Sequence, residues 1–442
     1  MTGVTARLAE WVHDMRHTAL GPGVEHQAKR IVLDYLAAAV AGARTEVSRA
    51  VRSVVAELYP GDDAGLVGGG RASAAGAALA NGTAAHALDV DDGYTPGSVH
   101  PSAPTLPAVL AAAERAGADP VTVLRAVAVA VEVTCRVARA GHPATRHAGF
   151  HNTSLAGVFG AAAGVCVVLG LDDVSSALGL AGSHAGGLFE FLGSGTEVKR
   201  LHAGKAARDG LLSAYLAARG VTGPASVLEG DNGYFHAFAR DQWRPADLLD
   251  GLGTDWALRD TYVKTHPCCR HLHGPVDALL ALRAAHDLAS VQAIRVETYA
   301  IAAAHAHLGL DSLLDAQMSL PYTAAVAVLD GRMGLAQFDR AHRTSPAVAD
   351  LAKRVEVVAA DDLDARYPAE RPARVTVRRT DGPDLRAEVA QPRGEPSTPL
   401  SDDDLTAKFH LLAGPVLGSA TAARVVRSVW AFDDIAFLRE VQ

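Results

Sequence analysis

The chain has 442 residues, of which 49% are hydrophobic and 20% are charged, and its formal net charge is −8. This length exceeds the roughly 100–200 residues of one domain, so we expect two domains with a sizeable buried core, and the composition excludes a disordered chain. An acidic chain without a Lys/Arg-rich run has no electrostatic footprint for nucleic acid or for an anionic membrane, so we expect neither as a partner.

The sequence carries no sign of export or of membrane insertion. The N-terminal stretch MTGVTARLAEWVHDMRH lacks the apolar core of a signal peptide and has the pattern of an amphipathic helix. The apolar run AAAGVCVVLGL ends at Asp172, which makes it too short for a membrane span. The four cysteines, at positions 135, 166, 268 and 269, do not form a disulfide framework. We therefore expect a cytoplasmic protein.

From about residue 24 to residue 262 the sequence predicts one helix after another. Apolar residues in 28–39 recur at the i, i+3, i+4, i+7 spacing, and Gly42 follows as a helix stop. Pro104 and Pro120 open two further apolar runs, as proline does in the first turn of a helix. The Gly- and Ala-rich stretch AAGAALANGTAAHAL indicates helix backbones in close approach.

Past about residue 285 the pattern changes to that of strands. Apolar and polar residues alternate in 291–300, 353–360 and 372–390, and the pair Asp381-Gly382 predicts a hairpin turn. Helical periodicity returns after a capping box that starts at Ser401. We predict a mainly α fold, in which a large all-helical domain is made of residues 1–262 and 400–442. A smaller α+β lid domain, residues 263–399, is inserted into it, and a cleft between domains is a favoured place for a ligand.

Three polar clusters interrupt the helical region. In NGTAAHALDVDDGYTPGSVHPSAP, Asp89 belongs to an acidic run, and His100 precedes a proline-started helix whose dipole favours neutral imidazole, a base near neutral pH. His151, in the sequence GFHN, stands at the start of a Gly/Ala-rich helix. Lys199 precedes a helix N-terminus in KRLHAGKAARDG, where a bound carboxylate would relieve the conflict between cation and dipole. The alternative for the first cluster is that its acidic residues cap a loop. The alternative for His151 is a structural histidine, and that for Lys199 is a solvated positive face.

The fourth cluster, VKTHPCCRHLHGPVD at 263–277, permits three interpretations. A zinc site is disfavoured because adjacent cysteines cannot easily chelate one ion and the usual spacing is missing, so we expect no metal. A thiol nucleophile would need a base and a lowered pKa, yet no cysteine-hydrolase signature surrounds Cys268 or Cys269. The interpretation we favour is that Lys264 and two histidines serve at the domain junction as acid/base groups and carboxylate holders.

In this order the clusters resemble the MmgE/PrpD family, which includes 2-methylcitrate dehydratase, cis-aconitate decarboxylase and iminodisuccinate epimerase. The resemblance runs through nearly the whole chain, from AKRIVLDYLAAAVAG through NGTAAHALDVDD, HPSAPTLPAVLAAAE and KTHPCCRHLHGPVDA to PLSDDDLTAKF. It implies a helical domain with a smaller α+β lid, usually in a homodimer. It also implies that a small-molecule carboxylate is the substrate and that no metal or organic cofactor is used.

The resemblance also implies roles for individual residues. The lysines and an arginine would hold substrate carboxylates, a histidine would move a proton at the carbon next to a carboxylate, and a tyrosine would donate a hydrogen bond to the developing charge. Which histidine is the base and which is the acid stays open. The implied catalytic residues are His100, His151, Lys264, His273 and Tyr322, and the implied substrate-binding residues are Asp89, Lys199, Arg270 and Cys269.

Three places depart from the family pattern. Cys269 stands where the decarboxylase has a histidine, five residues after the lysine that corresponds to Lys264. Gly93 replaces the threonine after the acidic run, and the methylcitrate dehydratases usually lack the Lys-Arg-Leu-His sequence at 199–202. We expect a cofactor-independent lyase that dehydrates or decarboxylates a small polycarboxylate. Alternatives are an epimerase of a dicarboxylate such as iminodisuccinate, an enzyme for a larger natural-product intermediate, and a catalytically inactive scaffold.

Overall fold

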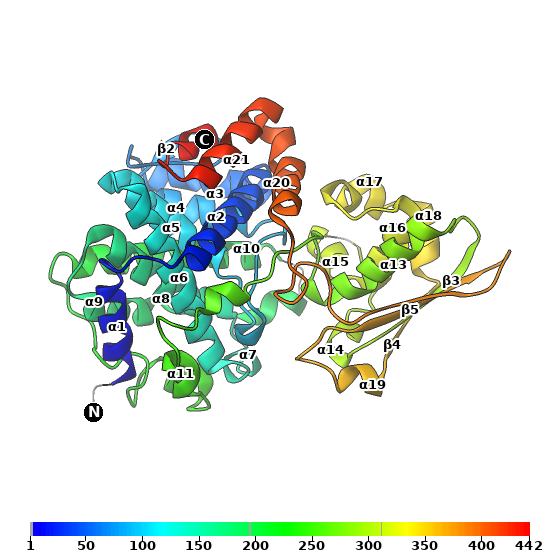
Figure 1. The fold of residues 1–442 in the computed structure, drawn as a ribbon, viewed down its shortest axis with the longest axis horizontal. Coiled ribbons are helices and arrows are strands. Elements are labelled where there is room, and N and C mark those ends of the chain that lie inside the picture. The colour runs from blue at the N-terminus through cyan, green and yellow to red at the C-terminus, as the bar shows by residue number, and fades with distance from the viewer. Residues whose placement is uncertain (1–2, 194–195, 311) are drawn as a thin grey trace. The chain divides into compact units, whose positions relative to one another are not determined.

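A computed structural model of the chain describes residues 3–193, 196–310 and 312–442. Its contacts divide the chain into two compact units, Met1–Val263 with Ser401–Gln442, and Lys264–Leu400. The second unit is thus one continuous segment between the two parts of the first (Figure 1). Helices dominate the described residues, which confirms the prediction of a mainly α protein.

Six long helices form the core of the first unit. Local signals set their ends: the Asp119 side chain accepts a hydrogen bond from the Thr122 N–H, and Pro120 occupies the first turn of the helix that follows. Helix α20, from the C-terminal part of the chain, packs beside α2 (Figure 1). The six are α2 (Pro22–Gly42), α4 (Ala74–Ala85), α5 (Ser102–Ala116), α6 (Pro120–Gly141), α8 (Asn152–Leu169) and α10 (Val198–Ala217).

Further elements complete the first unit, which is not wholly helical because β1 (Ala64–Gly65) and β2 (Arg71–Ala72) pair antiparallel. This small ribbon departs from the all-helical domain expected from the sequence. Two-residue strands are too short to show the alternation by which a strand is recognised. The remaining helices of four residues or more are α1 (Val4–Asp14), α3 (Glu46–Leu58), α7 (Ala144–His147), α9 (Val174–His184), α11 (Tyr234–Ala239), α12 (Pro245–Leu249), η2 (Phe189–Gly193), η3 (Ala257–Asp260), α20 (Asp402–Leu417), α21 (Ser419–Ala431) and α22 (Phe437–Glu440).

Helix α8 is the central helix of this unit. It has 18 residues and is long and apolar enough to cross a membrane by length and composition, yet 94% of it is buried inside the structure. Helices α5, α6, α9 and α10 contact it. A helix that is apolar on all sides is typical of a protein core as well as of a membrane span, and burial by neighbouring helices accounts for this one.

Two glycines let α4 and α10 approach each other closely. A Cβ atom on Gly82 would lie 2.8 Å from the Cα atom of Gly204, and a Cβ atom on Gly204 would lie 2.2 Å from the carbonyl oxygen of Leu79. Any larger residue at either position would therefore push the helices apart. This contact brings the loop after α4 near the first turns of α10.

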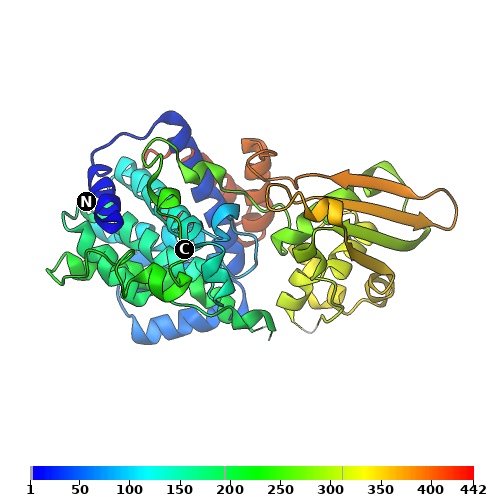
Figure 2. The ribbon, with the colours of Figure 1, turned by 90° about the horizontal axis from the view of Figure 1, so that it is seen from below.

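The second unit is an α+β sandwich of helices on one mixed sheet. The strand order is β4 (Val355–Ala359), β3 (Val291–Thr298), β5 (Ala373–Arg379), β6 (Leu385–Val389); β3 and β4 are parallel and the other pairs antiparallel (Figure 2). Apolar residues of the sheet and of the two longest helices form one buried cluster. The helices of four residues or more are α13 (His273–Ala285), α14 (Ala300–Ala303), α15 (Leu313–Met318), α16 (Leu320–Asp330), α17 (Arg340–Arg343), α18 (Pro346–Ala352), α19 (Asp361–Asp364) and η5 (Leu335–Phe338).

Candidate active site

Polar side chains from three separated segments meet in the first unit. The segments are the loop after α4, the residue that precedes α8, and the first turns of α10. Helix α10 contacts α4, α5 and α8. Charged and polar groups that are buried together at helix ends are candidates for chemistry because their proton affinities are perturbed.

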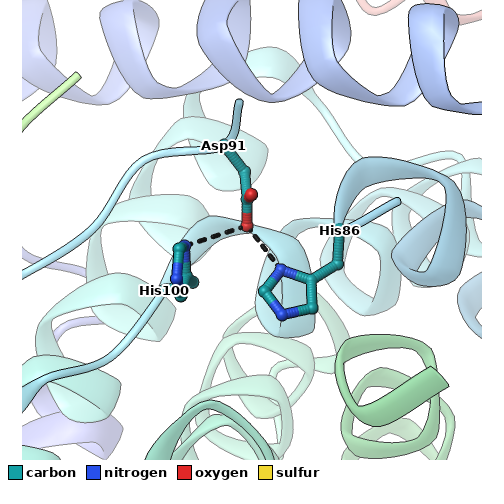
Figure 3. Close-up of side chains that lie close together, drawn as sticks. All are labelled: His86, Asp91 and His100. Atoms are coloured by element: carbon teal, nitrogen blue, oxygen red, sulfur yellow. Dashed lines mark hydrogen bonds and ion pairs between the residues drawn. The ribbon is translucent and has the colours of Figure 1, made fainter. Parts of the chain in front are cut away.

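Asp91 binds two histidines at once (Figure 3). Its Oδ2 atom lies 2.7 Å from Nδ1 of His86 and 3.2 Å from Nδ1 of His100. His100 Nδ1 also lies 2.7 Å from the carbonyl oxygen of Asp92. Because both neighbours of this nitrogen are acceptors, it carries the hydrogen, and the lone pair of the neutral ring is at Nε2. Asp91 therefore orients His100 as a base, in the way that a carboxylate orients a catalytic histidine.

Burial controls the charge of His86 and Asp91. Burial lowers the pKa of His86 to about 4, against the attraction of Asp91, so this imidazole is neutral near neutral pH. Burial alone would raise the pKa of Asp91, but its electrostatic interactions and hydrogen bonds with His100 and His86 outweigh burial and hold that pKa well below its usual range. The neutral His86 ring donates through Nδ1, and its buried Nε2 atom has no hydrogen-bond partner. A second imidazole lone pair is thus available beside His100.

A second layer of contacts holds this acidic loop. The N–H and hydroxyl groups of Ser102 donate to Asp92 Oδ1 at 3.2 and 2.6 Å. Burial, reinforced by the charges of Asp34 and Asp91, raises the pKa of Asp92 to about 8. The Lys408 ammonium, on α20, donates to Asp34 at 2.5 Å and to the carbonyl oxygen of Val90 at 2.8 Å. The C-terminal helices therefore help to fix the loop that carries Asp91.

Lys199 and Asp89 form a buried ion pair. Their Nζ and Oδ1 atoms are 2.5 Å apart, and the side chains are 9% and 5% exposed. Asp89 has a φ of 57°, a left-handed conformation that aspartate tolerates better than most residues. The tight turn after α4 thereby directs its carboxylate toward α10. An ammonium held here by one carboxylate still has donors to share with a second anion.

His151 and His202 extend the row of imidazoles. Their Nδ1 atoms are 3.0 Å apart, so one ring donates to the other. The ring of His151 also stacks on His86, with centroids 5.8 Å apart, and packs edge-on against Phe189 and Phe191 at 5.3 Å. Burial holds the pKa of His151 well below its usual range and lowers that of His202 to about 4. Both rings are therefore neutral near neutral pH and lie against an aromatic wall.

Among the described residues, one group of three could hold a metal ion. His86, Asp91 and His100 bring their ligand atoms within 4.8 Å of one another. The Nδ1 atom of His100, however, already points its hydrogen at the Asp92 carbonyl and at Asp91, whereas a ligand nitrogen must present a lone pair. The Nδ1 atoms of both histidines thus bind Asp91, and each ring keeps a lone pair at Nε2.

Tyr262 occupies the space of the missing side chain at position 93. A Cβ atom on Gly93 would lie 2.3 Å from the hydroxyl oxygen of Tyr262, and the backbones of the two residues pair through hydrogen bonds of 3.1 and 2.7 Å. The chain therefore presents a phenol hydroxyl beside the acidic loop where the family pattern has a threonine. Sequence reasoning did not find Tyr262, because it lies 169 positions after Gly93 in the chain.

In the second unit, Arg270 and His273 bind protein groups. Arg270 Nε lies 2.9 Å from Glu395, and its Nη1 atom lies 2.9 Å from Nδ1 of His273 and 3.1 Å from the carbonyl oxygen of Arg393. The Nε2 atom of His273 faces the Cys268 carbonyl oxygen at 3.3 Å. Burial, followed by the positive charge of Arg270, holds the pKa of His273 well below its usual range. These contacts are typical of residues that position a segment.

Tyr322 and Lys264 are also buried in the second unit. Tyr322, on α16, is 0% exposed and belongs to the apolar core of the second unit. Its hydroxyl group donates a hydrogen bond to the carbonyl oxygen of Gln337. Lys264 is 2% exposed. Catalytic roles for both, and for His273, stay predictions.

The structure thus divides the predicted site residues between the two units. It brings Asp89, His100, His151 and Lys199 together in the first unit, around residues that the prediction left out. His86 and Asp91 could have been selected from the run HALDVDD itself. No local signal marks His202 as their neighbour.

Comparisons with known proteins identify the family of this chain. The chain matches the MmgE/PrpD N-terminal domain over residues 6–246 and the MmgE/PrpD C-terminal domain over residues 266–434. It is 29% identical to the cis-aconitate decarboxylase-like protein oryM of Aspergillus oryzae, over 99% of this chain and 96% of that protein. It is 29% identical to a cis-aconitate decarboxylase of Aspergillus terreus (98% and 94%) and 28% identical to that of Homo sapiens (98% and 93%). The chain is a member of the MmgE/PrpD family.

Proposed function

We propose that this protein is a lyase that removes carbon dioxide or water from a small polycarboxylate, with cis-aconitate or a close relative of it as the first candidate substrate. The observation that carries the proposal is the pair of imidazoles on Asp91, which leaves a lone pair at Nε2 of both His86 and His100. Similarity over nearly the whole length of several cis-aconitate decarboxylases supports the carboxy-lyase form.

Both reactions need a proton carrier and a cation. Loss of carbon dioxide leaves an electron pair on carbon that must be protonated, and loss of water begins with removal of a proton next to a carboxylate. His100 can do either at Nε2, because the Asp91 carboxylate stabilises the imidazolium that forms. Lys199 would hold a substrate carboxylate with the ammonium donors that Asp89 leaves available.

We assign the other predicted residues supporting places in this scheme. His151 would line the substrate pocket together with His202, and the resemblance to the family suggests that Lys264 and Cys269 bind carboxylates. Arg270 and His273 would position the segment that carries them, since both bind neighbouring protein groups. We further propose that the enzyme acts without a metal or organic cofactor, as a homodimer, in the cytoplasm.

Proton NMR in D₂O tests the reaction class. The protein is incubated with citrate, 2-methylcitrate, cis-aconitate or iminodisuccinate in the presence of EDTA. Loss of carbon dioxide or water from one acid supports the proposal and names the reaction. Uptake of deuterium without loss of a group would instead identify an epimerase. If every acid stays unchanged while the protein is folded, the small-polycarboxylate proposal fails and an enzyme for a larger intermediate, or an inactive scaffold, replaces it.

A pair of histidine variants tests the site. His100→Gln removes the oriented base, and His17→Gln makes the same change at an exposed histidine of the same unit. We expect only His100→Gln to abolish the reaction seen by NMR. Equal activity in both variants would refute the role of His100. Restoration of activity by added Zn²⁺ or Mg²⁺ after EDTA would refute cofactor independence.

A further inference from the structure

A thiol and an imidazole meet within the second unit. Cys269 Sγ lies 3.9 Å from Nε2 of His305, within the reach of a hydrogen bond to sulfur. Cys269 is partly exposed, whereas Cys135, Cys166 and Cys268 are buried. Reagents in solution should therefore distinguish Cys269 from the other three thiols.

The backbone sets the tautomer of His305. Its Nδ1 atom lies 3.0 Å from the carbonyl oxygen of Met318, and a carbonyl can only accept, so Nδ1 carries the hydrogen. The N–H group of Leu320 donates to the carbonyl of His305 at 2.9 Å, which ties the same residue to the junction of α15 and α16. The lone pair at Nε2 then faces the Cys269 sulfur and can accept its proton.

A second imidazole, His271, lies beside this pair. His271 stacks on His305 with ring centroids 6.0 Å apart, and its Nδ1 atom lies 2.6 Å from the hydroxyl of Tyr299. Burial, followed by the positive charges of Arg371 and other neighbours such as Lys264, holds the pKa of His271 well below its usual range. Burial disfavours any charge here, whereas the positive charges of Arg371 and Lys264 near His271 favour an anion, and a thiolate is stabilised beside Lys, Arg or protonated His.

We propose that Cys269 is a reactive thiol, activated by His305, that forms a thioether with small α,β-unsaturated carboxylic acids. His305 Nε2 takes the thiol proton, and the sulfur electron pair forms a bond to the carbon β to the carboxylate. The electron pair of the double bond moves to the α carbon, which takes the proton back from His305. Atoms and electrons balance without an oxidant, a reductant or a leaving group. The choice of unsaturated acids rests on the proposed function, because lyases of this kind handle such acids.

The reactivity of the thiol is measured by the rate of alkylation by iodoacetamide as a function of pH, with the modified residue located by peptide mass spectrometry. We expect modification at Cys269, with a midpoint at least about one pH unit below the ordinary thiol value of about 8.5. His305→Asn keeps an amide donor for the Met318 carbonyl and removes Nε2, so it should raise the midpoint by about one unit. His307→Asn, the same change at an exposed neighbour, is the control and should leave the midpoint in place.

The addition itself is tested with maleate as the unsaturated acid and succinate as its saturated counterpart. We expect a gain of one maleic acid on the Cys269 peptide of the wild-type protein, none with succinate, and none in Cys269→Ser. An ordinary midpoint, a midpoint that His305→Asn does not move, or the absence of a maleate adduct at Cys269 would overturn the proposal. Alkylation requires no turnover, so these results are independent of whether the NMR assay detects a lyase.

Discussion

Replacing Lys199 with methionine removes the ammonium from the buried ion pair with Asp89 and keeps a side chain of similar length. Because the partners are 9% and 5% exposed, the remaining carboxylate cannot be solvated by water in place of the lost ammonium. Removal of one partner of such a pair costs about 3–5 kcal/mol. Protonation of the Asp89 carboxylate sets an upper limit on this loss of stability, because neutralising a carboxyl of pKa about 3.9 at about pH 7 costs about 4 kcal/mol. We therefore expect the free energy of unfolding to fall by about 3–4 kcal/mol.

The assay is urea unfolding at neutral pH of four proteins: the wild type, Lys199→Met, Asp89→Asn and the double variant. Removing both charges leaves no buried carboxylate deprived of its ammonium, so we expect the double variant to be more stable than Lys199→Met by about 2 kcal/mol. Lys205→Met is the matched control, because Lys205 pairs with Asp209 at 3.2 Å but is 36% exposed. It should cost at most about 1 kcal/mol. A similar small cost for Lys199→Met, or additive effects in the double variant, would refute the reasoning.

Three further outcomes follow from the site. His100→Gln should lower kcat by about 10²- to 10⁴-fold on whichever acid the NMR assay identifies; a rate equal to that of His17→Gln would contradict its role as base. Gly93→Thr should lower the melting temperature, because its Cβ atom would lie 2.3 Å from the Tyr262 hydroxyl, and adding Tyr262→Ala should restore part of the loss. Burial lowers the pKa of His202 to about 4, so the unfolded chain, with an ordinary value of about 6.5, binds the proton first and stability falls as the pH drops through this window. Urea unfolding should show that, between about pH 7 and pH 4, the free energy of unfolding of His202→Asn falls by about 1–2 kcal/mol less than that of the wild type. An equal fall in both proteins would show that His202 is not held neutral.

Signals that act over a few residues were sufficient for most of the secondary structure. The start of α6 at Pro120 after the Asp119 cap and the hairpin between β5 and β6 follow from local backbone preferences. Gly42 is the last residue of α2, but a Cβ atom there would lie 1.9 Å from the carbonyl oxygen of Ala84, so close packing is what requires glycine. The strands near 291–300 and 372–390 were visible because side chains alternate between a buried and an exposed face. The ribbon of β1 and β2 was missed because two residues per strand show no period.

The sequence by itself determined the mainly α class and the polar clusters, since helical periodicity and unusual runs such as HALDVDD are properties of neighbouring residues. Only the tertiary structure decided which polar groups meet. Asp89 and Lys199 are 110 residues apart in the chain, His151 and His202 are 51 apart, and Cys269 and His305 are 36 apart. Each meeting depends on how helices and loops pack, as at the glycine contact between α4 and α10, and packing is decided by complementary surfaces that no single segment contains.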